Sequence, residues 1–333
     1  MIIGFNSGQM HHFAQMEWLK NGFVPDSFIE RVKKENAPEE LVTLRVAGVV
    51  SNEWALDLPG YNHPMHDQQI NNRKDLIQPT QSYFPAFIDF YKKLGFKELI
   101  WTMNTISPWS NPSERALWEK RMMDMLEALK AAGIKVKVIA MENEAWMYPQ
   151  CMLLGNGGLD ILDKFAIAGW KGIFKNNNYF QPIVKEWMRS YYEYIEGISR
   201  EVKKRYPWCK IAISIDDNSH LRGQWMAETI KEFKFYDIVT PHFYLSPANK
   251  TELNAIVDSK MAHARSFGKD IYVTEWNWKY DNSSKDTQGA YHDKYFHNDM
   301  LSAFRANGAK GAFKHTLWAG ASAYGHMSQY AKS

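Results

Sequence analysis

The sequence VIAMENEAW, from Val138 to Trp146, begins as an apolar run and then meets the polar pair Asn143 and Glu144. A short apolar run of this kind is typical of a strand buried in a parallel sheet. A second stretch, IYVTEWNW from Ile271 to Trp278, has the same form and carries Glu275. Each stretch therefore places a carboxylate at the carboxyl end of a predicted strand, which is where parallel sheets carry functional residues.

Short apolar strands alternate with helical segments along the whole sequence. The predicted strands are 2–6, 41–50, 98–104, 135–141, 210–215, 237–244, 271–278 and 311–318, and the predicted helices are 25–34, 83–94, 111–132, 182–205, 224–233, 251–267 and 288–307. Glycine directly follows several of these helices, as expected at a helix end. The pattern predicts an α/β fold, a single (β/α)8 TIM barrel that uses residues 1–333 as one catalytic domain.

The spacing of these elements also predicts where the long loops lie. Residues 51–80 and 145–180 follow the second and fourth strands, so we expect long loops at the C-terminal face of the barrel. Only residues 319–333 follow the eighth strand, which leaves room for a last helix that is short, irregular or missing.

Composition excludes several classes of protein. The formal net charge of +3 comes from 40 basic and 37 acidic residues, which is too small a bias to predict nucleic-acid binding. No apolar run is long enough to predict a membrane span, and no segment has the form of a signal peptide. The localisation stays open: secreted or periplasmic if a signal has been removed, and otherwise cytoplasmic. Cys151 and Cys209 have no metal-site spacing, and the oligomeric state is left open.

Two carboxylates that face each other across a sugar are the groups that glycosidic cleavage requires. Glu144 fits the acid that protonates the leaving oxygen, and Glu275 fits the nucleophile. Glu142 lies two residues from Glu144, and we favour Glu144 because Asn143 precedes it directly. Either Glu taken alone is equally a solvated loop carboxylate, so the prediction depends on the residues around the pair.

Arg45 lies inside an apolar predicted strand, where a guanidinium needs a partner. A carboxylate at the barrel mouth, Glu275, is the natural partner, although another acidic residue would serve equally for a structural ion pair. His242 and Tyr244 alternate along the sixth strand and so point to one side of it, from which Tyr244 could donate to Glu275. Further candidates for substrate contacts are Asn104, Asn143, Trp278 and Trp318.

Metal binding is disfavoured. No convincing metal-ligand spacing occurs in the segments that contain His11 and His12, His63 and His66, or Asp216. We therefore predict no metal site and interpret these side chains as solvated polar groups or substrate contacts.

The residues Arg45, Asn143 with Glu144, His242, Tyr244, Glu275 and Trp318, in this order, resemble the active-site set of clan A glycoside hydrolases. The segment TLRVAG from Thr43 to Gly48 is similar to the second-strand motif of its beta-xylosidase/iduronidase, heparanase-like and agarase-like families. The chain departs from them in having Ala47-Gly48-Val49 where Pro-Gly-Gly is usual, and in lacking an accessory beta-sandwich. The resemblance implies retaining hydrolysis, with Glu275 as nucleophile, Glu144 as acid and then base, and no cofactor.

The expected function is a retaining glycoside hydrolase that cleaves a polysaccharide or oligosaccharide. Six tryptophans in or beside loops after strands suggest several sugar subsites and endo action; they are Trp54, Trp109, Trp146, Trp170, Trp276 and Trp278. A catalytically inactive, lectin-like barrel is the main alternative, and a metal-dependent hydrolase or a lyase is a third. Lysines in the same loops leave an anionic substrate open.

Overall fold

The fold was analysed in a computed structural model. It describes residues 1–6, 24–35, 38–46, 84–103, 105, 109, 112–113, 115–143, 177–216, 221–278 and 295–315.

Eight parallel strands form a closed barrel in the order β1 to β8. The strands are β1 Ile2–Asn6, β2 Thr43–Val46, β3 Glu98–Thr102, β4 Val136–Ala140, β5 Lys210–Ile215, β6 Ile238–Leu245, β7 Asp270–Trp278 and β8 Gly311–His315. The barrel closes where β1 pairs with β8 over five residues, from Ile2 opposite Gly311 to Asn6 opposite His315. The predicted (β/α)8 TIM barrel is therefore confirmed.

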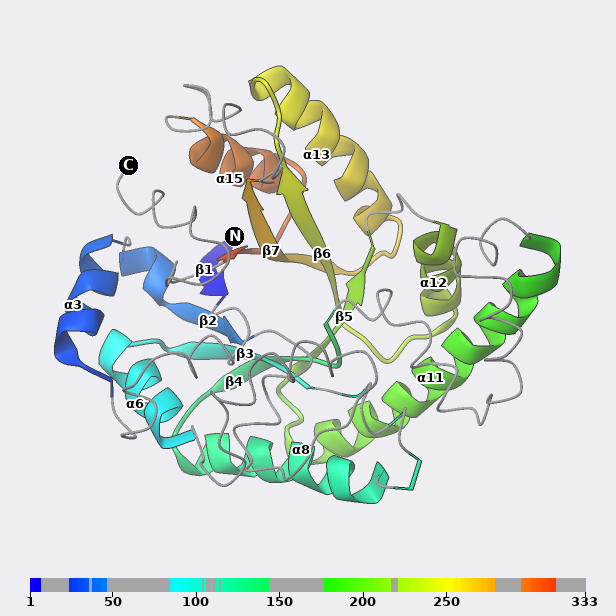
Figure 1. The fold of residues 1–333 in the computed structure, drawn as a ribbon, viewed down its shortest axis with the longest axis horizontal. Helices are drawn as coiled ribbons and strands as arrows, with labels where there is room; N and C mark the ends of the chain where they lie inside the picture. The colour runs from blue at the N-terminus through cyan, green and yellow to red at the C-terminus, as the bar shows by residue number, and fades with distance from the viewer. Residues whose placement is uncertain are drawn as a thin grey trace, which may run out of the picture.

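The helices form a ring outside the strands, as Figure 1 shows. Their bounds are α3 Asp26–Glu35, α6 Phe84–Leu94, α8 Arg115–Ala131, α11 Asn177–Arg205, α12 Leu221–Glu232, α13 Lys250–Arg265 and α15 Phe296–Ala306, and a short 3-10 helix, η1, covers Pro38–Leu41. Gly95, Gly133, Gly268 and Gly308 follow four of these helices with positive φ, which glycine adopts without strain. Among the described helices, none combines the length and the apolar character that a membrane crossing requires.

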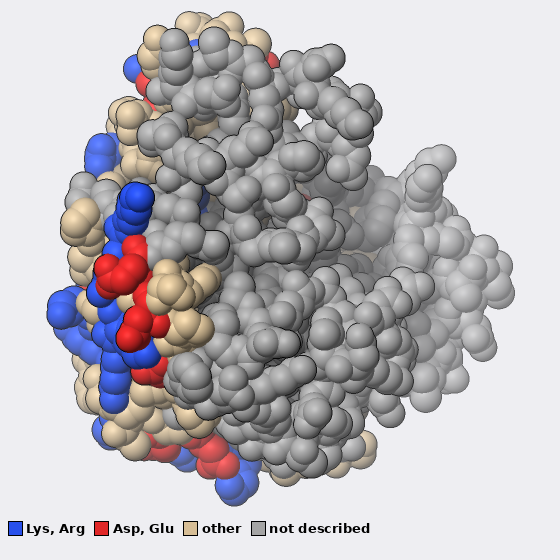
Figure 2. All heavy atoms as spheres, turned by 60° about the vertical axis from the view of Figure 1, so that its left-hand side comes forward, with Lys and Arg blue, Asp and Glu red and all other residues tan. Residues whose placement is uncertain are grey.

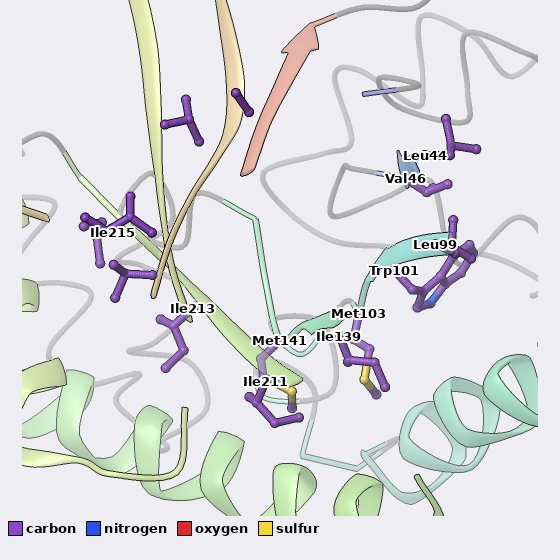
Figure 3. Close-up of a cluster of buried hydrophobic side chains, with 14 of the residues drawn as sticks. Leu44, Val46, Leu99, Trp101, Met103, Ile139, Met141, Ile211, Ile213 and Ile215 are labelled. Atoms are coloured by element: carbon purple, nitrogen blue, oxygen red, sulfur yellow. The ribbon is translucent and has the colours of Figure 1, made fainter. Parts of the chain in front are cut away.

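Side chains that alternate along each strand enter two different cores. Val138 and Ala140 of β4 face the barrel interior, where they meet Tyr272 and Phe313 from the opposite side. Ile139 and Met141 face the helices and belong to the larger outer core. Figure 3 shows this outer core along β2 to β5, with Leu44, Leu99, Ile139, Ile211 and neighbouring apolar side chains. Both faces of each strand are buried, which explains the nearly continuous apolar runs in the sequence.

Glycine makes room for the large rings inside the barrel. Tyr272 of β7 and Phe313 of β8 are stacked with centroids 6.2 Å apart. A Cβ added to Gly4 would lie 2.3 Å from the carbonyl oxygen of Thr43 and 2.8 Å from the Phe313 ring. The close approach of β1 to β2 therefore requires glycine at this position.

Several boundaries differ from the predicted ones by a few residues, and the starts of β2 and α11 are two examples. Leu41 lies in η1, so β2 begins at Thr43, two residues later than expected. Helix α11 begins at Asn177, five residues before Pro182, although we expected it to begin at the proline. Pro182 therefore lies in the second turn of the helix, where its missing N–H removes one backbone hydrogen bond.

The charged surface is mixed in sign. On the described part of the face in Figure 2, lysines and arginines lie among aspartates and glutamates. Elsewhere among the described residues, Arg189 of α11 and Glu232 of α12 form an exposed pair. This interspersion agrees with the small net charge and gives no basic stripe of the kind that binds nucleic acid on that described surface.

Candidate active site

Glu275 reaches the barrel interior because β7 contains a bulge. Along β6 the chain advances from Val239 to His242 while β7 advances from Ile271 to Glu275, one residue more. The pairing of β7 with β8 shifts in the same region. An extra residue changes which side chains face inward, so Glu275 faces inward like the neighbouring His242, and Trp276 faces the helices.

The Glu275 carboxylate is held by donors from two other strands. Arg45 of β2 donates from an Nη atom to Glu275 Oε1 over 2.8 Å, and Tyr244 of β6 donates its hydroxyl to Oε2 over 2.8 Å. Arg45 is 1% exposed and Glu275 is 7% exposed. A charge-assisted pair this well buried is stronger than a surface pair, and it restricts the carboxylate to one orientation.

Arg45 also joins β4 to the cluster. Its second Nη atom donates to Asn143 Oδ1 over 2.6 Å, and the first also donates to the Thr274 carbonyl over 3.2 Å. Asn6 of β1 donates to the same carbonyl over 3.4 Å. The ends of β1, β2, β4, β6 and β7 thus meet around one guanidinium and one carboxylate.

His242 lies against the other side of the carboxylate. Its Nδ1 is 3.6 Å from Glu275 Oε2, and its Nε2 is 3.1 Å from the hydroxyl of Thr274. The ring is buried, and it is held between two groups on the same bulge. Arg45, Tyr244 and His242 therefore surround Glu275 from three directions.

Glu142 is engaged in a different contact. It is completely buried, accepts a hydrogen bond from the backbone N–H of Ser214 over 2.7 Å, and accepts a second one from the Ser214 hydroxyl. Burial and the nearby Glu142 carboxylate raise the pKa of the Tyr192 phenol well above its ordinary value. The paired residues of β4 and β5 end at Ala140 and Ala212. The hydrogen bonds from Ser214 to the Glu142 carboxylate therefore link the two chain segments beyond the paired residues.

Comparison with known proteins finds the fold but no sequence relative. No model of a known protein family matches the chain, and no curated protein matches it. Among solved structures, the endo-1,4-beta-D-mannanase of Thermotoga petrophila RKU-1 has a TM-score of 0.51 at 13% identity, covering 94% of this chain and 87% of its own. A broad-specificity GH5-4 endoglucanase from an uncultured bacterium has a TM-score of 0.51 at 12% identity, covering 94% and 86%.

A third match, the alpha-L-arabinofuranosidase of Thermotoga maritima, has a TM-score of 0.45 at 15% identity; the match covers 88% of this chain and 59% of the arabinofuranosidase. The two higher-scoring structures, named as a mannanase and an endoglucanase, share the barrel described above. The chain has their fold. The resemblance expected from the sequence is therefore confirmed for the fold.

The structure brings together five of the nine predicted site residues, namely Arg45, Asn143, His242, Tyr244 and Glu275. Asn104, Glu144 and Trp318 lie outside the described residues. Trp278 is described and lies apart from the cluster. It is 4% exposed, belongs to the outer core, and packs edge-on against Phe296 of α15.

Two further tryptophans that suggested sugar subsites are packed in the outer core. Trp276 lies against Phe304 and His297, and Trp109 lies against Tyr191 and Tyr194. Both are at most 5% exposed. Trp276 lies within β7, and after the bulge its side chain points from the strand toward the helices.

Sequence reasoning missed three polar residues of the cluster and its surroundings. Asn6, Thr274 and Ser214 are buried and hydrogen-bonded within it. Asn6 ends a predicted strand and Thr274 directly precedes the predicted nucleophile, so their positions alone were a usable signal. Ser214 had no such signal, because a serine in a barrel strand is common.

The described residues contain no group of three or more His, Cys, Asp or Glu side chains that could hold a metal ion. The chemistry of the cluster therefore depends on how the neighbouring side chains hold the Glu275 carboxylate. This carboxylate is held in one orientation by Arg45 and Tyr244, and the Arg45 guanidinium beside it balances its charge. Such an arrangement suits a nucleophile.

Proposed function

We propose that the protein is a retaining glycoside hydrolase that cleaves a polysaccharide or oligosaccharide by double displacement. The observation that carries the proposal is the Glu275 carboxylate, turned inward by the β7 bulge and held by Arg45 and Tyr244. The shared barrel fold supports it, because the solved structures with that fold are named as a mannanase and an endoglucanase.

In the first step, a Glu275 oxygen attacks the anomeric carbon while Glu144 gives a proton to the leaving oxygen. The products are a covalent glycosyl-enzyme ester and the released alcohol end of the substrate. In the second step, Glu144 takes a proton from water, the water oxygen attacks the same carbon, and Glu275 leaves as a carboxylate. The cycle requires no metal or organic cofactor.

The contacts of Glu275 suit this sequence. Arg45 balances the negative charge before attack and after release, and it fixes the oxygen that it binds. Asn143, held by the same guanidinium, lies beside the proposed acid in sequence and is the proposed contact to a sugar hydroxyl. We also propose Asn104 and Trp318 as substrate contacts; Trp278, which packs on α15, is left out.

Endo action rests on fewer tryptophans than the sequence suggested. Three of the six that indicated an extended substrate, Trp109, Trp276 and Trp278, are engaged in core packing. The prediction of several subsites therefore depends on Trp54, Trp146 and Trp170, which lie outside the described residues.

The test is product formation from a broad panel of neutral and charged polysaccharides, measured by mass spectrometry. Glu275→Ala is compared with the unmodified protein and with Glu201→Ala, an exposed carboxylate on α11 that serves as the control. We expect cleavage by the unmodified protein and the control, and none by Glu275→Ala. Equal cleavage by Glu275→Ala would show that the nucleophile is wrongly assigned, and retention of a polymer without cleavage would favour the lectin-like alternative.

Azide separates the two carboxylate roles. In Glu275→Ala, azide in place of the nucleophile should give a glycosyl azide of inverted configuration from an activated glycoside of the cleaved sugar. In Glu144→Ala, azide should attack the glycosyl enzyme and give the retained configuration. The opposite pattern would exchange the two assignments.

A further inference from the structure

Thr274 contacts the proposed catalytic cluster through two different groups. It lies in the β7 bulge directly before Glu275 and is completely buried. Its carbonyl accepts from Arg45 and Asn6, and its hydroxyl lies 3.1 Å from His242 Nε2. The backbone contacts are independent of the side chain, whereas the hydroxyl contact is available only to Thr or Ser at this position.

The surroundings of the His242 ring determine which nitrogen carries the proton in the neutral form. Nδ1 faces Glu275 Oε2 at 3.6 Å, and an ionised carboxylate only accepts hydrogen bonds. A lone pair on Nδ1 would face that negative charge, whereas a proton on Nδ1 is attracted to it. The carboxylate therefore favours the proton on Nδ1, which leaves the lone pair on Nε2.

A buried lone pair on Nε2 needs a donor, and the Thr274 hydroxyl lies within hydrogen-bond distance of it. A threonine hydroxyl both donates and accepts, so it can meet either form of the ring. The carboxylate favours the proton on Nδ1, and a hydroxyl that donates to Nε2 stabilises the same form of the ring.

We propose that Thr274 is a positioning residue, whose hydroxyl donates to His242 Nε2 and, together with Glu275, holds the proton of the neutral ring on Nδ1, facing Glu275. The description of Glu275 as the nucleophile rests on the proposed function, but the position of the proton does not. With this arrangement Oε2 accepts from Tyr244 and faces the N–H of His242, while Oε1 accepts from Arg45. Thr274 thereby orders one side of the carboxylate without touching it through its side chain.

The experiment is nitrogen NMR of the full chain labelled with ¹⁵N-histidine, without substrate, at about pH 8, above the ordinary pKa of histidine. Two-bond nitrogen–hydrogen correlations to the ring C–H protons assign each signal to Nδ1 or Nε2, and the chemical shift of that signal then shows whether the nitrogen is protonated. Eleven histidines contribute, so the signals of His242 are assigned by their loss in His242→Gln. We expect protonated Nδ1 and unprotonated Nε2 in the unmodified protein and in Thr274→Ser, which keeps the hydroxyl.

Thr274→Val has nearly the same shape but no donor. We expect its His242 signals to lose the pure Nδ1–H pattern and to show a population protonated on Nε2. If Thr274→Val does not fold, Thr274→Ala is measured in its place. The proposal is overturned if the unmodified protein carries the proton on Nε2 or on both nitrogens, or if the folded Val or Ala variant keeps the unmodified pattern.

The two proposals fail separately. The expected proton position in a protein that cleaves no polysaccharide overturns the proposed function and supports the assignment of Thr274. Cleavage that depends on Glu275, together with a His242 proton on Nε2, overturns the assignment of Thr274 and supports the proposed function.

Discussion

Replacing Arg45 by Met tests whether the central ion pair stabilises the fold as its geometry indicates. Arg45 is 1% exposed and donates to Glu275, Asn143 and the Thr274 carbonyl. Met fills a similar space without charge, so the variant leaves Glu275 buried with no cation from β2 beside it. Breaking a buried pair from one side costs about 3–5 kcal/mol in the free energy of unfolding.

The double variant isolates the pair. In Glu275→Gln the carboxylate charge is absent, so Arg45→Met removes a cation that no longer has its partner. We expect Arg45→Met to cost less in this background, by about 1–3 kcal/mol, which is the coupling between the two residues. The control is Arg189→Met, which breaks an exposed pair with Glu232 and should cost about 0–1 kcal/mol.

The assay is urea unfolding followed by circular dichroism, with the slope m compared among the variants so that only changes in midpoint are interpreted as stability. The reasoning is refuted if Arg45→Met costs the same in the unmodified protein and in the Glu275→Gln background. It is equally refuted if Arg45→Met costs no more than Arg189→Met.

Three further predictions concern stability. Gly4→Ala places a Cβ too close to the Thr43 carbonyl of β2 and should lower the free energy of unfolding by about 1–3 kcal/mol. The control, Gly197→Ala, lies in α11 with its nearest neighbour 4.0 Å away and should raise the free energy of unfolding by about 0.5–1 kcal/mol. Both changes are measured as shifts of the urea midpoint. Glu142→Leu removes the acceptor of a buried β5 amide and should cost about 1–3 kcal/mol, more than Glu142→Gln, which keeps an acceptor; a smaller cost for Leu would contradict the role described. Burial raises the pKa of Tyr236 to about 12. The unfolded chain releases this proton near about pH 10, so stability should fall as the pH rises from about 10 to 12, and Tyr236→Phe should reduce that slope in unfolding measured against pH.

The strands could be predicted from the sequence because both of their faces are buried. Val136 to Ala140 and Lys210 to Ile215 read as short apolar runs, and glycines with positive φ mark the helix ends between such runs. The cluster around Glu275 followed from the same reasoning, since parallel strands bring their carboxyl ends to one face.

The bulge in β7 could not be predicted, because strict alternation from Tyr272 puts Thr274 inward and Glu275 toward the helices. The sequence carries no sign of the extra residue, which is visible only as a shift in pairing with both neighbouring strands. The same shift explains why Trp276 and Trp278, which looked like subsite residues, face the outer core.

The contact between Glu142 and Ser214 was equally hidden from the sequence. These residues are 72 positions apart, and only the register of β4 and β5 brings them together. Without that register, Glu142 and Glu144 differ only in which of them follows Asn143.

The reach of Arg45 along the chain has a consequence for synthesis on the ribosome. Its partner Asn143 is 98 residues further along, and Glu275 is 230 residues further along. Among the described residues Glu275 is the anion paired with Arg45, so until β7 is made the guanidinium is without this partner and the inner face of β2 stays hydrated. We therefore expect the inner side of the β1 to β4 half of the barrel to lose its water only after β7, in the last quarter of the chain, has been synthesised.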